Sequence, residues 1–257
     1  MKLFGEARLL VAVYNSESAK FSPDFNLKCF KEAIDTNPQQ EKALFLYAQY
    51  FERVHNNLED KYKGNQSKID YLVNAMIYYG KSLMFGCNYI NQSMPRFLSI
   101  WLDYTAKKDD SASKNHMHQL NQYMQRYMET LPTFMFLTAF SQLVSRICHP
   151  NQETYTILKS ILINLIKTYP QQSLWMFLAV YKSTYENRVR RCKEILYDKR
   201  LTSNQKFIWK FNELTEHMIN LTNAEVTEEI EKEGKTACGA VATKVSKLYP
   251  CKYYFSL

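Results

Sequence analysis

"NQSMPRFLSIWLDY", residues 91–104, contains the pattern that decides the fold. Polar residues lead into Pro95, and large apolar side chains then recur at the spacing of one helical face: Phe97, Leu98, Trp101 and Tyr104. Proline is tolerated in the first turn of a helix, because its missing N–H has no helical partner there. The stretch therefore predicts a helix that is capped by Ser93 or Met94 and begins at Pro95. Its aromatic stripe would either pack against neighbouring helices or line a pocket.

The composition of the whole chain also favours helices. Of its 257 residues, 46% are apolar, and only six are glycine and seven proline. All-β and α/β proteins need many tight turns, so this scarcity argues against both classes. No segment shows sustained strand alternation, and the apolar spacing predicts about eleven helices. They are expected near residues 3–16, 24–36, 39–57, 67–85, 94–108, 113–129, 133–148, 151–169, 171–183, 186–199 and 203–222. Six prolines are expected to mark helix starts: Pro23, Pro38, Pro95, Pro132, Pro150 and Pro170.

The predicted helices recur in pairs of roughly 32 to 43 residues, as in tetratricopeptide and related helical repeats. There is also an internal echo, because "NPQQEKALFLYAQY" (37–50) and "YPQQSLWMFLAVYK" (169–182) share Pro-Gln-Gln and, at the same offset, Phe-Leu. A single amphipathic helix cannot bury its apolar face alone, so each pair must stack on the next. We therefore predict an all-α solenoid of antiparallel helix pairs, tetratricopeptide- or HEAT-like. The aromatic stripe then packs between helices rather than lining a pocket. The predicted packing residues are Phe97, Leu98, Trp101, Tyr104, Phe177 and Leu178.

Two regions of different character divide the chain. Residues 1–222 are expected to form one helical-repeat domain with short polar linkers. Beyond them the sequence "AEVTEEIEKEGK" is acidic, and the remainder is small, basic and aromatic. Residues 223–257 are therefore predicted to be a loosely held tail.

The chain has a net charge of +8, and its six cysteines are widely spaced with no Cys-x-x-Cys pair. This cysteine usage fits reduced thiols, and no apolar run is long enough for a membrane span, so we expect a soluble intracellular protein. The densest basic stretch, "YENRVRRCKEIL", supplies four candidate interaction residues: Arg188, Arg190, Arg191 and Lys193. The favoured interpretation is a solvated face that pairs with nearby glutamates. Contact with an acidic partner or nucleic acid is the alternative.

Motifs for catalysis, cofactor binding or metal binding are not found in the sequence. Gly234-Lys235-Thr236 resembles the end of a phosphate-binding loop, but the required upstream glycine is replaced by Glu229. His116 and His118 are two residues apart, so on a helix they point in different directions and cannot share one metal. No catalytic, cofactor-binding or metal-binding residue is therefore predicted, and an independent enzyme is the least favoured interpretation.

Several ordered blocks of the sequence resemble a known family. They are "GEARLLVAVYNSESA", "EKALFLYAQYFERV", "YINQSMPRFLSIWLDY", "FLTAFSQLVSRICHPNQETY", "YPQQSLWMFLAVYKS" and "RVRRCKEIL". Together, from about Gly5 to Leu221, they closely resemble the FAT region of ATR-type kinases, members of the phosphatidylinositol 3-kinase-related protein kinase family. The resemblance does not clearly extend beyond this region.

The resemblance implies a C-shaped helical solenoid that clamps a kinase domain and contributes to dimer contacts. It implies a non-catalytic scaffold role in DNA-damage and replication-stress checkpoint signalling, in the nucleus. The implied partners are the kinase domain, the remaining solenoid, a second copy and an ATR-interacting protein, with no direct nucleic-acid or membrane contact. ATP and a divalent metal would belong to the kinase domain, expected after the position of Leu221. The end at Leu257 leaves a fragment, an alternative product and a gene-model boundary open. A free-standing basic repeat protein that binds nucleic acid or an acidic partner is the alternative function.

Overall fold

The computed structural model describes residues 2–18, 20–57, 66–107 and 111–222. These residues form twelve α-helices and one short 3₁₀ helix, and none of them lies in a strand. The elements in chain order are α1 (Lys2–Ser18), α2 (Pro23–Thr36), α3 (Glu41–Asn57), α4 (Gln66–Phe85), α5 (Ile90–Thr105), α6 (Ser111–Thr130), α7 (Thr133–Leu137), α8 (Phe140–Ser145), α9 (Gln152–Thr168), α10 (Pro170–Tyr181), α11 (Glu186–Leu196), η2 (Lys199–Asn204) and α12 (Gln205–Thr222).

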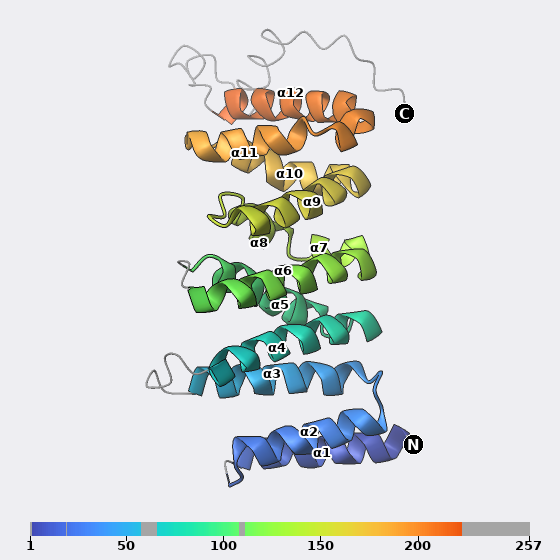
Figure 1. Cartoon of the computed structure of the whole chain (residues 1–257). Coiled ribbons are helices and arrows are strands. Elements are labelled where there is room, and N and C mark those ends of the chain that lie inside the picture. Colours follow the sequence, from blue (N-terminus) through green and yellow to red (C-terminus); the bar gives the residue numbers. More distant parts are fainter. Residues whose placement is uncertain (1, 19, 58–65, 108–110, 223–257) are drawn as a thin grey trace, which may run out of the picture. The chain divides into compact units, whose positions relative to one another are not determined.

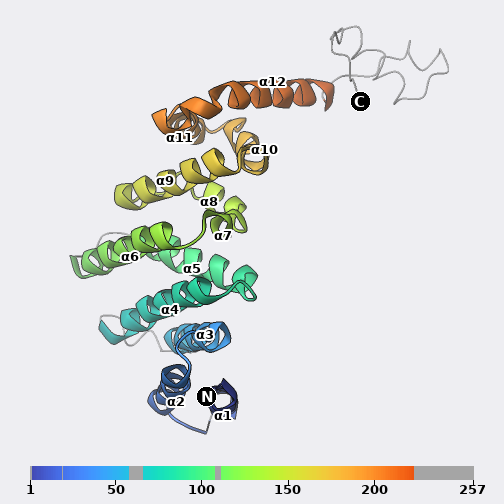
Figure 2. The same cartoon turned by 90° about the vertical axis from the view of Figure 1, so that its right-hand side faces the viewer.

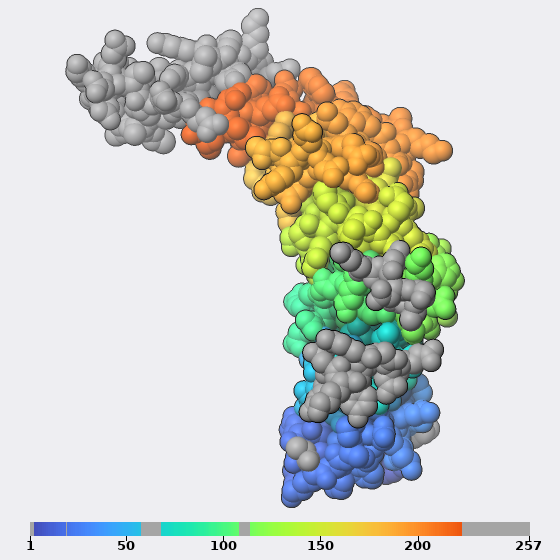
Figure 3. Space-filling model, turned by 60° about the vertical axis from the view of Figure 1, so that its left-hand side comes forward, coloured from blue at the N-terminus to red at the C-terminus, as the bar shows by residue number. Residues whose placement is uncertain are grey.

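Two compact units make up the chain, residues 1–202 and residues 203–257. In the first unit the helices follow one another in antiparallel pairs, and each packs on helices that lie one to three places away in the chain (Figures 1 and 2). The surface of this unit accordingly shows the colours in sequence order (Figure 3). The described part of the second unit is mainly α12. The predicted tail, residues 223–257, lies outside the described residues. The all-α solenoid predicted from the sequence is thus confirmed.

The core of the first unit is a continuous series of interfaces between helices rather than one central cluster. Its largest fully buried side chains belong to helices α2, α4, α5, α8 and α10, and they are Trp101, Tyr79, Phe30, Phe97, Phe140 and Phe177. Short-range packing of this kind is expected of a repeat architecture, in which each repeat buries its apolar face on the next.

Local sequence signals explain several helix starts. Pro23 opens α2, and the Ser22 hydroxyl accepts a hydrogen bond from the backbone N–H of Phe25 at 3.3 Å. Pro170 likewise opens α10. At α9 the Asn151 side chain accepts a hydrogen bond from the backbone N–H of Thr154 at 3.0 Å. The Ser22 and Asn151 side chains each satisfy a backbone donor that has no partner within the helix, whereas Pro170 has no N–H to satisfy.

The predicted start of the helix around residues 94–108 is wrong. Helix α5 begins at Ile90, and Pro95 lies inside it. The cause is tertiary, because the buried Glu41 carboxylate accepts the Asn88 side-chain amide at 2.8 Å and the backbone N–H of Tyr89 at 2.9 Å. A carboxylate at a helix N-terminus stabilises the end of the helix dipole. Helix α5 therefore begins well before its proline.

Two other boundaries also differ from the prediction. The single helix expected over residues 133–148 is two short helices, α7 and α8, separated by Thr138 and Ala139. Tight bonds between residues three apart form this break, and the Thr138 hydroxyl donates to the carbonyl of Met135 at 2.7 Å. The short linker expected between the predicted helices 186–199 and 203–222 contains part of η2, whose Leu201 is fully buried.

Candidate functional site

The aromatic stripe of α5 lies in the interior of the first unit. Phe97, Leu98 and Trp101 are fully buried, and Tyr104 is 5% exposed. The Phe97 ring meets the Tyr127 ring of α6 edge-on, with the centroids 5.4 Å apart. On α10, the predicted packing residues Phe177 and Leu178 are also buried. All six side chains therefore lie among other helices rather than at a surface.

A buried polar network surrounds Trp101. The indole Nε1 donates to the Asn121 side-chain oxygen on α6 at 2.8 Å. The same oxygen accepts the Thr154 hydroxyl of α9 at 3.0 Å. One amide oxygen thus joins side chains of three helices, and Trp101 and Thr154 lie 20 and 33 residues from Asn121 in the chain. Because buried polar groups are costly without partners, the network specifies how these helices pack.

His149 extends this polar region toward the end of α5. Its ring is 3% exposed, and Nδ1 accepts the backbone N–H of Asn151 at 3.2 Å. Since Nδ1 is an acceptor, Nε2 carries the proton and donates to the Leu102 carbonyl at 3.0 Å. His149 therefore has a structural position, between the α8–α9 turn and α5.

Two carboxylates fasten α3 to the following helices. Besides Glu41 at the start of α5, Glu52 accepts the Tyr79 hydroxyl of α4 at 2.9 Å and the Arg96 Nε of α5 at 3.2 Å. Burial raises the pKa of Tyr79 above its usual value, so the phenol remains a proton donor. Sequence reasoning missed both contacts, because these partners are 27 to 48 residues apart.

The histidines of α6 also have partners on neighbouring helices. His118 lies 2.9 Å from the Glu153 carboxylate of α9, and His116 lies 3.9 Å from Asp70 of α4. The two side chains thus face different helices, in agreement with their spacing. Across the described ranges, no group of three or more His, Cys, Asp or Glu side chains is arranged to hold a metal ion. No helix in those ranges is long and apolar enough to cross a membrane.

The four basic candidate residues of α11 are divided between different environments. The guanidinium of Arg191 lies 3.3 Å from the centroid of the Tyr155 ring on α9. Arg188 lies over the ring of Tyr185, and Arg190 is 3.8 Å from the Glu194 carboxylate. The fourth residue, Lys193, is exposed. The structure therefore does not gather the four cations on one open face.

Arg191 belongs instead to a local cluster between α9 and α11. The Tyr155 hydroxyl donates to Glu194 at 2.8 Å. Burial, followed by this hydrogen bond to an anion, raises the pKa of Tyr155 to about 12. On α11, burial also raises the pKa of the Cys192 thiol to about 12. Such a thiol remains protonated and unreactive.

Two family models match consecutive parts of this packed chain. The FAT domain model matches residues 2–99, and the model for serine/threonine-protein kinase ATR-like HEAT repeats matches residues 119–220. The chain belongs to the FAT-type helical region of ATR-like kinases. Within the described residues, both matches fall mainly on helices.

Individual relatives agree with the family models. Serine/threonine-protein kinase ATR of Drosophila melanogaster is 40% identical over 231 residues, which cover 88% of this chain and 9% of the relative. The corresponding kinase of Arabidopsis thaliana is 36% identical over 71% of this chain and 7% of its own length. Protein kinase rad3 of Schizosaccharomyces pombe is 34% identical over 60% of this chain and 7% of its own length. This ATR-like chain thus spans under a tenth of the length of these relatives.

Proposed function

We propose that this ATR-like chain is a non-catalytic helical scaffold within a serine/threonine protein kinase. The observation that carries the proposal is that its most specific side chains join one helix to the next. Trp101, Asn121 and Thr154 connect α5, α6 and α9, while Glu41 fixes the start of α5 against α3. In a solenoid such contacts set the spacing of the repeats, and hence the geometry of any surface they support.

In the full-length protein this segment would support the kinase domain and the rest of the solenoid. Contacts within a homodimer and with an ATR-interacting protein belong to the same proposal. ATP and a divalent metal would bind in the kinase domain. A role in DNA-damage and replication-stress checkpoint signalling in the nucleus, which the resemblance to ATR-type kinases implies, belongs to the same proposal.

A chimera tests the scaffold role directly. The segment of the Drosophila kinase that aligns with this chain would be replaced by this chain, and phosphorylation of a protein substrate would be measured. We expect the chimera to keep kinase activity and the isolated chain to show none. A Trp101→Ala chimera should lose activity, whereas a chimera with a substitution at the exposed Lys193 should not. Phosphotransfer by the isolated chain, or equal activity of all chimeras, would contradict the proposal.

Salt-dependent DNA binding would point instead to the alternative, a free-standing basic repeat protein. Arg190→Glu and Lys193→Glu are the appropriate changes, because both positions are exposed and lie outside the Arg191–Tyr155 contact. Steep salt dependence that disappears in this double variant would favour nucleic-acid binding over the scaffold. Weak binding that is insensitive to salt is the result expected of the scaffold.

A further inference from the structure

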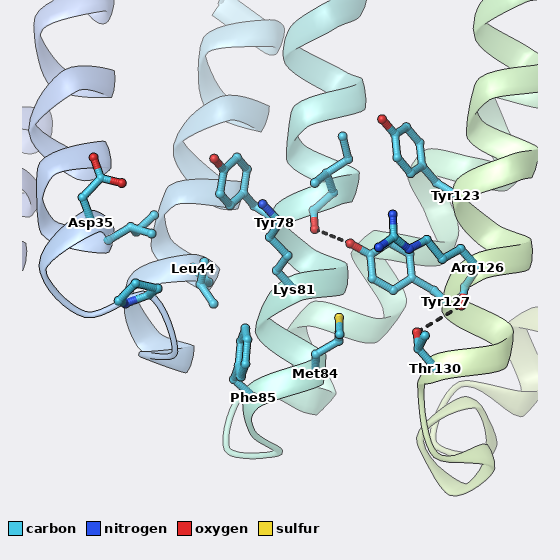
Figure 4. A pocket seen from close by; sticks show the side chains of 13 residues that line it. Asp35, Leu44, Tyr78, Lys81, Met84, Phe85, Tyr123, Arg126, Tyr127 and Thr130 are labelled. Carbon is cyan, nitrogen blue, oxygen red and sulfur yellow. Dashed lines mark hydrogen bonds between the residues drawn. The ribbon is translucent and has the colours of Figure 1, made fainter.

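A groove of about 500 Å³ opens in the first unit and is lined by residues of α2, α3, α4 and α6 (Figure 4). We refer to it as the α4–α6 groove. Neither the scaffold role nor the family matches assign a function to it. Four observations indicate which chemistry it would bind: a closed floor, an exposed apolar wall, two cations without a carboxylate partner among the described residues, and one acidic edge.

The floor depends on a close approach of α4 and α6. A side chain on Gly80 would overlap the Tyr127 ring, so only glycine allows the two helices to meet this closely. The Tyr127 hydroxyl donates to the Ile77 carbonyl at 2.9 Å, which fixes the ring across the gap. Burial raises the pKa of Tyr127 to about 12, so this phenol stays neutral and the bond persists at physiological pH.

The wall of the groove is apolar and exposed. Met84 and Phe85, at the end of α4, are 49% and 43% exposed and lie beside the buried Leu44. In Figure 4, Met84 and Phe85 lie below Lys81 on α4, and Arg126 lies on α6. A flexible thioether beside an aromatic ring can adapt to several apolar side chains. This wall is therefore suited to an aromatic or aliphatic residue of a partner.

Two basic residues lie in the same groove, Lys81 on α4 and Arg126 on α6. Within the described part of the chain, neither side chain forms an ion pair with a carboxylate. Arg96, Arg146 and Arg200, by contrast, each pair with a carboxylate. The Lys81 ammonium lies 4.7 Å from the centroid of the Tyr78 ring, which positions it without neutralising its charge. Across the groove, Asp35 on α2 is the acidic group among the lining residues.

We propose that the α4–α6 groove binds a peptide segment of a partner protein in which an acidic residue stands beside an aromatic or aliphatic one. The acidic side chain would pair with Lys81 and Arg126, and the apolar side chain would cover Met84 and Phe85. Asp35 repels an acidic side chain at the opposite edge, and this repulsion sets the direction of the peptide. A free phosphate ion would use only the cations and leave the apolar wall exposed.

Methyl NMR of the full chain can test this proposal, because Met84 lies in the groove and Met176 is an exposed methionine outside it. The probe is the acetylated and amidated peptide Gly-Asp-Phe-Asp-Gly. Its two controls carry Asn in place of Asp, or Ala in place of Phe. We expect a saturable shift of the Met84 methyl signal with the probe, an unchanged Met176 signal and binding at least about tenfold weaker for each control peptide.

Matched protein variants complete the test. Lys81→Glu combined with Arg126→Glu should abolish the Met84 shift, while Arg190→Glu combined with Lys193→Glu changes the charge equally and should leave it intact. Circular dichroism verifies that each variant is folded. The proposal is overturned by an unchanged Met84 signal, by equal binding of the Asn peptide or by equal loss in both double variants. Inorganic phosphate that shifts Met84 as the probe does would also overturn it, in favour of a simple anion site.

Discussion

The structure makes a quantitative prediction for Trp101, the residue at the centre of the α5 stripe. Its indole is fully buried, and its Nε1 donates to Asn121 at 2.8 Å. Trp101→Ala removes a large apolar volume from a close-packed interior and should lower the free energy of unfolding by about 3–5 kcal/mol. Trp101→Phe keeps most of the ring volume but loses the hydrogen bond, so its cost should be about 1–2 kcal/mol.

Two independent signals can measure this effect. Urea unfolding followed by circular dichroism gives the loss of stability. Tryptophan fluorescence identifies its source, because Trp175 and Trp209 are 56% and 62% exposed and Trp101 is the buried one of the three tryptophans. The Phe variant should therefore lose the blue-shifted part of the native emission and retain the emission of exposed indoles.

Trp175→Ala is the matched control, since it removes the same side chain from a mostly exposed position in the same unit. It should cost less than about 1 kcal/mol. If Trp101→Ala unfolds at the same urea concentration as the parent, or costs no more than Trp175→Ala, the assignment of Trp101 as an inter-helix packing residue is refuted.

Three further predictions follow from particular contacts. Gly80→Ala should lower the free energy of unfolding by about 1–3 kcal/mol, because the added Cβ overlaps the Tyr127 ring. This loss is expected although alanine favours helices more than glycine does. A variant that is more stable than the parent in urea unfolding would contradict the close approach of α4 and α6. Asn151→Ala should lower the free energy of unfolding by about 0.5–2 kcal/mol, since it removes the side chain that caps the backbone N–H of Thr154. An unchanged thermal midpoint would show that the cap contributes nothing to stability. The pKa of Tyr155 is raised from 10.0 to about 12 in the folded chain, so its contribution to stability is present below pH 10 and is lost as the pH rises toward 12. Urea unfolding across this range should show a smaller loss for Tyr155→Phe than for the parent, and equal losses would refute the assignment.

The sequence predicted the helical class and the stacking because these depend on local patterns. Apolar spacing places Phe97, Leu98 and Trp101 on one face, and a helix with such a face must bury it against another element. The helix starts expected at Pro23 and Pro170 were similarly local signals, and α2 and α10 begin there. The ordered family blocks were also readable directly, and the family models match most of the same residues.

The start of α5 and the break between α7 and α8 required the tertiary structure. Pro95 predicts a helix start on its own, but the Glu41 carboxylate, 48 residues from Tyr89, stabilises an earlier one. The α4–α6 groove is not visible in the sequence for the same reason. Gly80 and Tyr127 are distant in the chain, and their contact exists only because α4 packs on α6.

The sequence by itself determined that this ATR-like chain is a stack of amphipathic helices, because the period of its apolar residues is a local property of the backbone. Only the tertiary structure decided which polar side chains meet. It paired Trp101 with Asn121, placed Arg191 on Tyr155 and left Lys81 and Arg126 without carboxylate partners within the described ranges. Hydrogen bonds and ion pairs depend on distances of a few ångströms between residues far apart in the chain, and those distances are set when the helices pack.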